Sequence, residues 1–216
     1  MNFLNRFLVF FAACIFCAAA VAQQADNPYP QVLAAVRSGD LPKVRQLIEK
    51  GGANINSRNR LGESLLMMAV KGGKSDIANY LLDRGADVKI ASTSQATPLM
   101  AAAFNGDLPM VNRLIDKGVD VNALDQQKKT AMVYAAAQGH AEVVARLLKA
   151  GVDVNARYAN ELTALMWAAG QGHVQVVKVL LEAGADAALK DNRGKTAADI
   201  ARETGHAEMQ KLLGGA

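Results

Sequence analysis

The stretch that decides the fold is residues 97–122, TPLMAAAFNGDLPMVNRLIDKGVDVN. Thr97 can cap free backbone amides and Pro98 fits the first turn of a helix, so a helix is expected to begin here. Gly106 is expected to end it, because glycine accepts the left-handed backbone that follows a helix. Asp107 then predicts the start of a second helix, which Gly118 ends before an extended connection.

Copies of this unit recur every 33 residues. The position of Thr97 is filled by Ser64, Thr130, Thr163 and Thr196, and that of Gly106 by Gly73, Gly139, Gly172 and Gly205. A fixed period of this length is typical of stacked-repeat proteins. We therefore expect an all-α solenoid of about six helix-turn-helix units with extended hairpin loops. The units are expected at about 30–57, 58–90, 91–123, 124–156, 157–189 and 190–216, and the first carries an extra residue near Gly51-Gly52.

The repeated residues also resemble a known family. The fourth unit contains Asp125, Thr130, Ala135-Ala136, Gly139-His140, Val143-Val144, Leu147-Leu148 and Gly151-Val152-Asp153-Val154-Asn155. This pattern is similar to that of ankyrin-repeat proteins, and the resemblance covers about Pro30 to Ala216. The family's histidine after T-P-L is replaced by Met67, Met100, Val133, Met166 and Asp199. We therefore expect apolar packing beside the helix starts instead of a ladder of side-chain hydrogen bonds.

The first 22 residues have the features of a secretory signal peptide. Arg6 precedes an apolar run from Phe7 to Ala19, and Ala20-Val21-Ala22 is the small-residue pattern that a signal peptidase cuts. Residues 23–29 are expected to form a linker. Both cysteines lie in this leader, so the processed chain would have no disulfide. Lipidation at Cys14 is the alternative for this segment.

These features predict a location in the bacterial periplasm, with secretion further out as the alternative. The apolar run is too short for a membrane span, so no stable membrane insertion is expected after cleavage. The formal net charge of the whole chain is +4, which does not favour nucleic-acid binding. We expect a monomer.

No reactive constellation stands out in the sequence. His140, His173 and His206 lie 33 residues apart, on successive layers of the solenoid, and cannot converge on one metal ion. Gly194-Lys195-Thr196 resembles the end of a phosphate loop, but residue 189, where that loop needs a glycine, is Leu189. We therefore expect no catalysis, no metal site and no cofactor.

What remains is a surface on which the sequence varies from copy to copy. In ankyrin arrays the loop tips and the exposed side of the first helices form one strip, which we name the concave strip. Exposed Leu61, Phe104, Tyr158 and Leu162 would favour recognition of a partner, and its arginines and lysines would favour an acidic one. The candidate residues are Arg58, Arg60, Leu61, Glu63, Lys71, Phe104, Asn105, Gln127, Lys129, Gln138, Arg157, Tyr158, Asn160, Leu162, Gln171, Arg193 and Lys195.

The sequence therefore predicts a non-enzymatic protein-protein interaction module of the cell envelope. Neighbouring repeats would hold its loops rigidly, so that binding loses little conformational entropy. The alternative is a stress-protection or holdase-like protein that binds exported chains broadly.

Overall fold

The computed structural model describes residues 27–206 and 208–214, and the predicted leader with Cys14 and Cys17 lies outside them. Within the described part, twelve α-helices form six pairs, with no β-strand. The pairs are α2 (Pro28–Ser38) and α3 (Leu41–Glu49), α4 (Leu65–Lys71) and α5 (Ser75–Asp83), α6 (Pro98–Asn105) and α7 (Leu108–Asp116), α8 (Ala131–Gln138) and α9 (Ala141–Lys149), α10 (Ala164–Gly170) and α11 (Val174–Glu182), α12 (Ala197–Glu203) and α13 (Met209–Leu213).

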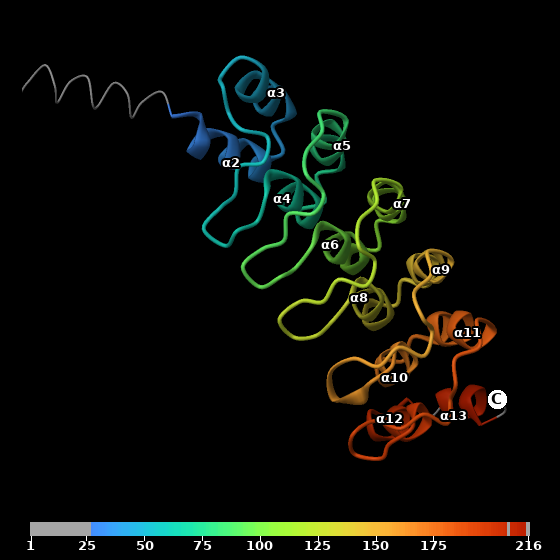
Figure 1. The fold of residues 1–216 in the computed structure, drawn as a ribbon. Helices are drawn as coiled ribbons and strands as arrows, with labels where there is room; N and C mark the ends of the chain where they lie inside the picture. The colour runs from blue at the N-terminus through green and yellow to red at the C-terminus, as the bar shows by residue number, and fades with distance from the viewer. Residues whose placement is uncertain (1–26, 207, 215–216) are drawn as a thin grey trace, which may run out of the picture.

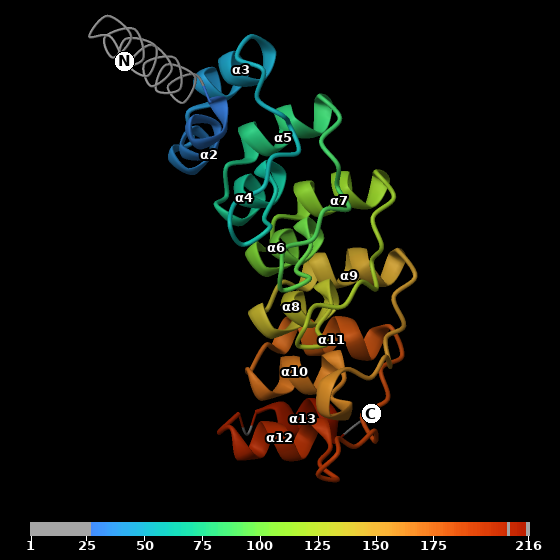
Figure 2. The ribbon, with the colours of Figure 1, turned by 60° about the vertical axis from the view of Figure 1, so that its left-hand side comes forward.

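The helix pairs stack into a curved solenoid (Figure 1). The first helices of the pairs form the inner row, the second helices form the outer row, and the loops between pairs project beside the inner row. Figure 2 shows the pairs as successive layers along the solenoid. The predicted all-α solenoid is confirmed, and a short 3₁₀ turn, η1 (Ala159–Glu161), lies in the loop between α9 and α10.

The helix boundaries follow from the capping residues. The Thr97 side chain accepts a hydrogen bond from the Met100 amide at 3.3 Å at the start of α6. Gly106 ends α6 with φ at 69°, and its N–H bonds to carbonyl oxygens of the last turn. The Asp107 side chain accepts from the Met110 amide at 3.0 Å and so starts α7. Each of these side chains satisfies an amide that has no partner within its helix.

The first unit begins earlier than the sequence suggested. Helix α2 starts at Pro28, inside the segment predicted as a linker, because the Asn27 side chain accepts from the Tyr29 amide at 3.0 Å. Proline is tolerated at both Pro28 and Pro30, since amides of the first turn have no intrahelical acceptor. An asparagine cap therefore replaces the Ser or Thr cap of the later units.

The core is built from small residues in the inner row and branched ones in the outer row. Ala102, Ala135 and Ala168 are fully buried in the first helices, and Leu114 and Leu147 are fully buried in the second helices. Small alanines let neighbouring units approach closely, which explains how a chain with few aromatic residues builds a continuous core.

At the position where the family has a histidine after T-P-L, this chain has buried apolar side chains, as predicted. The side chains at this position, Met67, Met100, Val133 and Met166, are 1–3% exposed. The Met100 sulfur also accepts the Thr97 amide at 3.4 Å. Asp199 differs, because its carboxylate accepts hydrogen bonds from the Thr196 amide and hydroxyl.

The repeat histidines couple one unit to the preceding one. His140 Nε2 lies 2.9 Å from the Phe104 carbonyl oxygen, and His173 Nε2 lies 2.9 Å from that of Ala137. A carbonyl oxygen can only accept, so Nε2 carries the hydrogen in each ring. These histidines therefore have a structural part in stacking the units.

Candidate functional site

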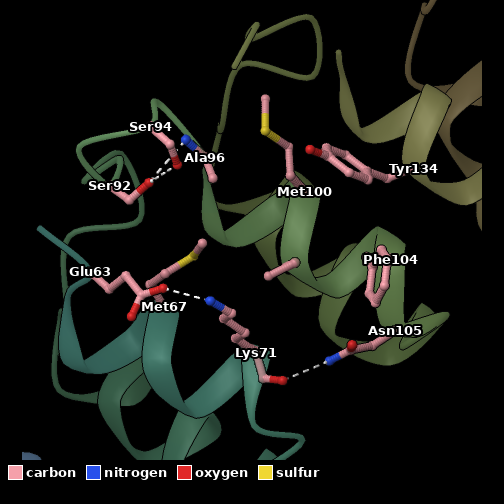
Figure 3. A pocket seen from close by; sticks show the side chains of 11 residues that line it. Glu63, Met67, Lys71, Ser92, Ser94, Ala96, Met100, Phe104, Asn105 and Tyr134 are labelled. Carbon is pink, nitrogen blue, oxygen red and sulfur yellow. Dashed lines mark hydrogen bonds and ion pairs between the residues drawn. The ribbon is translucent and has the colours of Figure 1, made fainter. Parts of the chain in front are cut away.

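A hollow in the concave strip lies between α4 and α6, and we name it the α4–α6 hollow. Its volume is ≈ 370 Å³, within the range of small ligand sites. Figure 3 shows its walls, formed by two inner helices, the loop between units two and three, and Tyr134 of α8. The lining residues are Glu63, Met67, Lys71, Ser92, Ser94, Ala96, Met100, Ala101, Phe104, Asn105 and Tyr134.

An ion pair forms one wall of the α4–α6 hollow. Glu63 is 8% exposed, and its carboxylate accepts from Lys71 Nζ at 2.8 Å and from Asn59 Nδ2 at 2.6 Å. Burial by itself would raise the pKa of Glu63, but these hydrogen bonds and the charge of Lys71 lower it below its ordinary value. The carboxylate is therefore charged and satisfied, which does not suit a general base at neutral pH.

Aromatic side chains form the opposite wall. Phe104 is 48% exposed and meets the Tyr134 ring edge-to-face, with 6.1 Å between the ring centroids. The Tyr134 hydroxyl donates to Asp125 Oδ2 at 2.5 Å. Burial, and then the hydrogen bond and charge of Asp125, raise the pKa of Tyr134 to about 12. One side of the Phe104 ring thus packs against Tyr134, which Asp125 holds in place, and the rest of the ring is exposed.

A second hollow, the α2–loop hollow, lies between α2 and the loop of the second unit. Its volume is ≈ 480 Å³, and it is lined by Tyr29, Pro30, Leu33, Ala34, Arg37, Asn59, Arg60 and Leu61. Leu61 is 58% exposed at the loop tip. The Tyr29 hydroxyl donates to the Arg58 carbonyl oxygen and so ties α2 to this loop. Leu61 and Phe104 are exposed as the sequence predicted.

The expected exposure of Tyr158 and Leu162 is wrong. Both are half-buried, and Leu162 packs against the core. The Tyr158 N–H bonds to the Leu162 carbonyl oxygen at 3.0 Å, which folds the loop back on itself. Asn160 in this loop adopts φ of 60° within η1. Neither side chain is therefore presented as freely as the sequence predicted.

The three basic candidate residues of units five and six are each paired with a carboxylate, which corrects the expected basic bias there. Arg157 pairs with Glu161 at 3.2 Å and Arg193 pairs with Asp191 at 2.8 Å. Lys195 pairs with Glu203 at 2.8 Å. In the second unit, by contrast, Arg58 and Arg60 are exposed with no carboxylate in ion-pair range among the described residues.

The remaining candidates of the concave strip divide into structural and exposed residues. Asn105 Nδ2 donates to the Val70 carbonyl oxygen at 2.9 Å and so connects α6 to α4. Lys129 lies over the rings of Tyr134 and Trp167, at 5.9 and 5.1 Å from their centroids. Three glutamines are exposed at this surface: Gln127, Gln138 and Gln171.

Sequence reasoning missed several walls of the two hollows. Tyr29 was assigned to the linker. Arg37 lies on α2, and because the first unit lacks the Ser or Thr motif of the other units, its position could not be aligned with theirs. Met67 and Met100 were expected only in the core, although both also line the α4–α6 hollow. Alignment of the repeats assigns each residue to one side of the solenoid. It does not show where two neighbouring units leave a hollow between them.

Two further properties concern residues 27–206 and 208–214. No cluster of three or more His, Cys, Asp or Glu side chains there could hold a metal ion. None of their helices combines the length and the apolar character needed to cross a membrane.

Comparison with known families decides the classification. The sequence model described as "Ankyrin repeats (3 copies)" matches residues 11–92, 85–158 and 134–215. The chain belongs to the ankyrin-repeat family. The helix pairs, the capping threonines and the projecting loops are those expected of ankyrin repeats, so the predicted resemblance is confirmed.

Curated relatives match only part of the ankyrin array. The chain is similar to E3 ubiquitin-protein ligase Ufd4 of Drosophila melanogaster (38% identity over 71 residues, 33% of this chain and 3% of that protein). It is also similar to the 2-5A-dependent ribonuclease of Mus musculus, with 39% identity over 67 residues, which are 31% of this chain and 9% of that protein. Ankyrin repeat and SAM domain-containing protein 6 of Rattus norvegicus is 40% identical over 73 residues, which are 33% of this chain and 8% of that protein. The matched segments thus span less than a tenth of each relative.

Proposed function

We propose that this chain is a non-enzymatic module that binds a protein partner through its concave strip. Ankyrin repeats are generally protein-protein interaction modules. The observation that carries the proposal for this chain is the α4–α6 hollow with Phe104 standing half exposed at its edge. An exposed aromatic residue beside a hollow is the kind of anchor that dominates binding energy at protein interfaces.

The walls of the α4–α6 hollow are held in place before any partner arrives. Asn105 connects α6 to α4, the Glu63–Lys71 ion pair spans one wall, and Tyr134 is fixed by Asp125. A preformed surface loses little side-chain entropy when it binds. The stacked repeats therefore suit rigid display of a recognition surface.

Export to the cell envelope is the second part of the proposal. It rests on the leader-like composition of residues 1–22, an apolar run behind Arg6 that ends in Ala20-Val21-Ala22. We propose that the processed protein acts in the periplasm as a monomer and without a cofactor.

A cross-linking pull-down from an envelope extract of the source organism tests the proposal. The bait is the purified protein, and the control bait carries Arg60→Glu and Phe104→Ala with unchanged helical circular dichroism. We expect one dominant protein that the control bait loses. Identical proteins with both baits would place binding on another face and contradict the proposal.

A holdase-like role is the alternative, favoured by Leu61, Phe104 and Leu124, which are 48–58% exposed. Such a protein would cross-link to many exported chains and would suppress the aggregation of a chemically unfolded test protein. A single stoichiometric partner and no suppression of aggregation would exclude this role.

A further inference from the structure

The apolar and charged side chains of the concave strip are not evenly distributed along the solenoid. Within the described part, the exposed large apolar residues are Tyr29, Leu61, Phe104 and Leu124, all in units one to four. Both hollows described above also lie there. Building on the proposed function, we propose that units one to four are the binding site, and that they take a partner segment with an apolar anchor flanked by carboxylates.

Most of the free cations of the strip lie at the same end. Arg37 and Arg60 line the α2–loop hollow and are exposed, with no carboxylate in ion-pair range among the described residues. Lys71 is paired with Glu63 and is therefore not a free cation, although 62% of its side chain is exposed at the edge of the α4–α6 hollow. Lys128 is exposed at the loop tip of the fourth unit. An anionic segment that lies along these units would therefore meet several cations.

The two acidic side chains nearest the α4–α6 hollow, Glu63 and Asp125, already have hydrogen-bond partners. The carboxylate of Glu63 accepts from Lys71 and Asn59, and the charge of Arg37 acts on it as well. Asp125 is 8% exposed and accepts from its own loop amides and from the Tyr134 hydroxyl. Neither acid presents an unpartnered carboxylate to a partner.

Units five and six provide the contrast within the same molecule. Most of their strip cations have a carboxylate partner, in the pairs Arg157–Glu161, Arg193–Asp191, Lys195–Glu203 and Arg202–Asp199. The exception is Lys190, one repeat after Arg157, which is exposed with no carboxylate in ion-pair range among the described residues. Tyr158 and Leu162 are half-buried. A surface on which most charges are paired and the apolar groups are half-buried offers less to an anion or to an apolar anchor.

The α4–α6 hollow fits the anchor. Met67, Met100, Ala101, Phe104 and Tyr134 form an apolar lining, and the methionine side chains can adapt to an aromatic or branched group. Lys71 and the α2–loop hollow with Arg60 lie on the N-terminal side of it. We therefore place the apolar side chain in the α4–α6 hollow and a flanking carboxylate toward Arg60.

Fluorescence anisotropy with the purified protein and fluorescein-labelled dodecapeptides tests this assignment. The first peptide has a central phenylalanine flanked by aspartates, the second replaces the phenylalanine by serine, and the third replaces the aspartates by lysines. We expect the first peptide to bind at least about ten-fold more tightly than the other two, a difference of about 1.4 kcal/mol. No preference for the first peptide would overturn the proposal.

Variants locate the site. Phe104→Ala and Arg60→Glu should each weaken binding of the first peptide by about ten-fold, and Arg157→Glu in the fifth unit is the matched charge reversal that should leave it unchanged. All of these side chains are exposed, and circular dichroism verifies that each variant is folded. Equal weakening by Arg157→Glu would overturn the assignment to units one to four. If the Arg157→Glu variant alone loses the partner in the pull-down, the assignment to units one to four is wrong. Binding through the concave strip, which is the proposed function, would still hold.

Discussion

Gly106 ends α6 with φ at 69° and also makes room for the next unit. A Cβ added at this glycine would lie 2.5 Å from Nδ1 of His140, whose ring bonds to the preceding unit. Gly118 has φ of 75° but nothing within 4 Å of such a Cβ. Two glycines with the same backbone geometry therefore carry different constraints.

We predict that Gly106→Ala costs more stability than Gly118→Ala. Both variants place an alanine in the left-handed region, at a cost of about 1–2 kcal/mol, but only Gly106→Ala must also displace His140. Urea unfolding measures the two changes in free energy. In a His140→Ala background the two glycine substitutions should cost nearly the same free energy of unfolding. Equal costs in the parent protein would refute the contact.

The raised pKa of Tyr134 predicts a pH dependence at the alkaline end. Its ordinary pKa is 10.0 and its folded pKa is about 12, so its contribution to stability is complete below pH 10 and is lost as the pH rises through 12. Tyr134→Phe should be less stable by about 1–2 kcal/mol at neutral pH, since it removes the hydrogen bond to Asp125.

The gap between Tyr134→Phe and the parent protein should narrow between pH 10 and about pH 12. Comparison with the parent is needed because burial also raises the pKa values of Tyr80 and Tyr158. Chemical unfolding followed by circular dichroism at several pH values measures the gap. A gap that stays constant across this window would argue against ionisation of Tyr134 as its source.

At the scale of elements, the first helices are spaced by alanine. Ala135 and Ala136 of α8 are fully buried, whereas Gln138 of the same helix is exposed. Helices that pack through side chains as small as alanine leave little room for a larger side chain. The inner row can therefore tolerate little change in volume.

We predict that Ala136→Leu destabilises the protein by about 1–3 kcal/mol or more, because the added atoms must separate α8 from its neighbours. Gln138→Leu introduces the same residue on the exposed side of the same helix, and its effect should stay within about 0.5 kcal/mol. Thermal and urea unfolding compare the pair. Similar costs for both variants would show that α8 has free space on its buried side.

At the scale of the whole molecule, each unit contacts mainly its neighbours. In such a solenoid, stability is a sum over units and over the interfaces between them. The sequence has one tryptophan, Trp167 of α10, which is half-buried, so its fluorescence reports on the fifth unit and circular dichroism reports on all helices.

We predict that Leu47→Ala in α3 loosens the first unit without moving the fluorescence transition of Trp167. Both Leu47 and Leu147 are buried, and a leucine-to-alanine change in a core costs about 2–5 kcal/mol. For Leu47→Ala the circular dichroism should change at lower urea than the fluorescence. Leu147→Ala in α9, beside the fifth unit, should move both transitions, and coincident shifts in both variants would indicate one cooperative unit.

The sequence predicted much of the fold because the relevant physics is local. Thr97, Gly106 and Asp107 set helix ends through their own backbone geometry and capping side chains, and the 33-residue period repeats these signals. The start of α2 was missed because Asn27 caps it with a different residue, in a segment without a repeat to compare. The candidate surface could be assigned by register, including the exposed Leu61 and Phe104.

The amino-acid sequence by itself thus determined the all-α solenoid, the order of its units and the face on which variable side chains lie. Only the tertiary structure decided which of those side chains are free. Tyr158 is half-buried, Leu162 packs against the core, and Arg157, Arg193 and Lys195 are paired with carboxylates. The α4–α6 hollow also appears only when α4, α6 and α8 are stacked. Exposure, ion pairing and hollows depend on distances between residues of different loops and units, and the spacing of residues along the chain does not contain those distances.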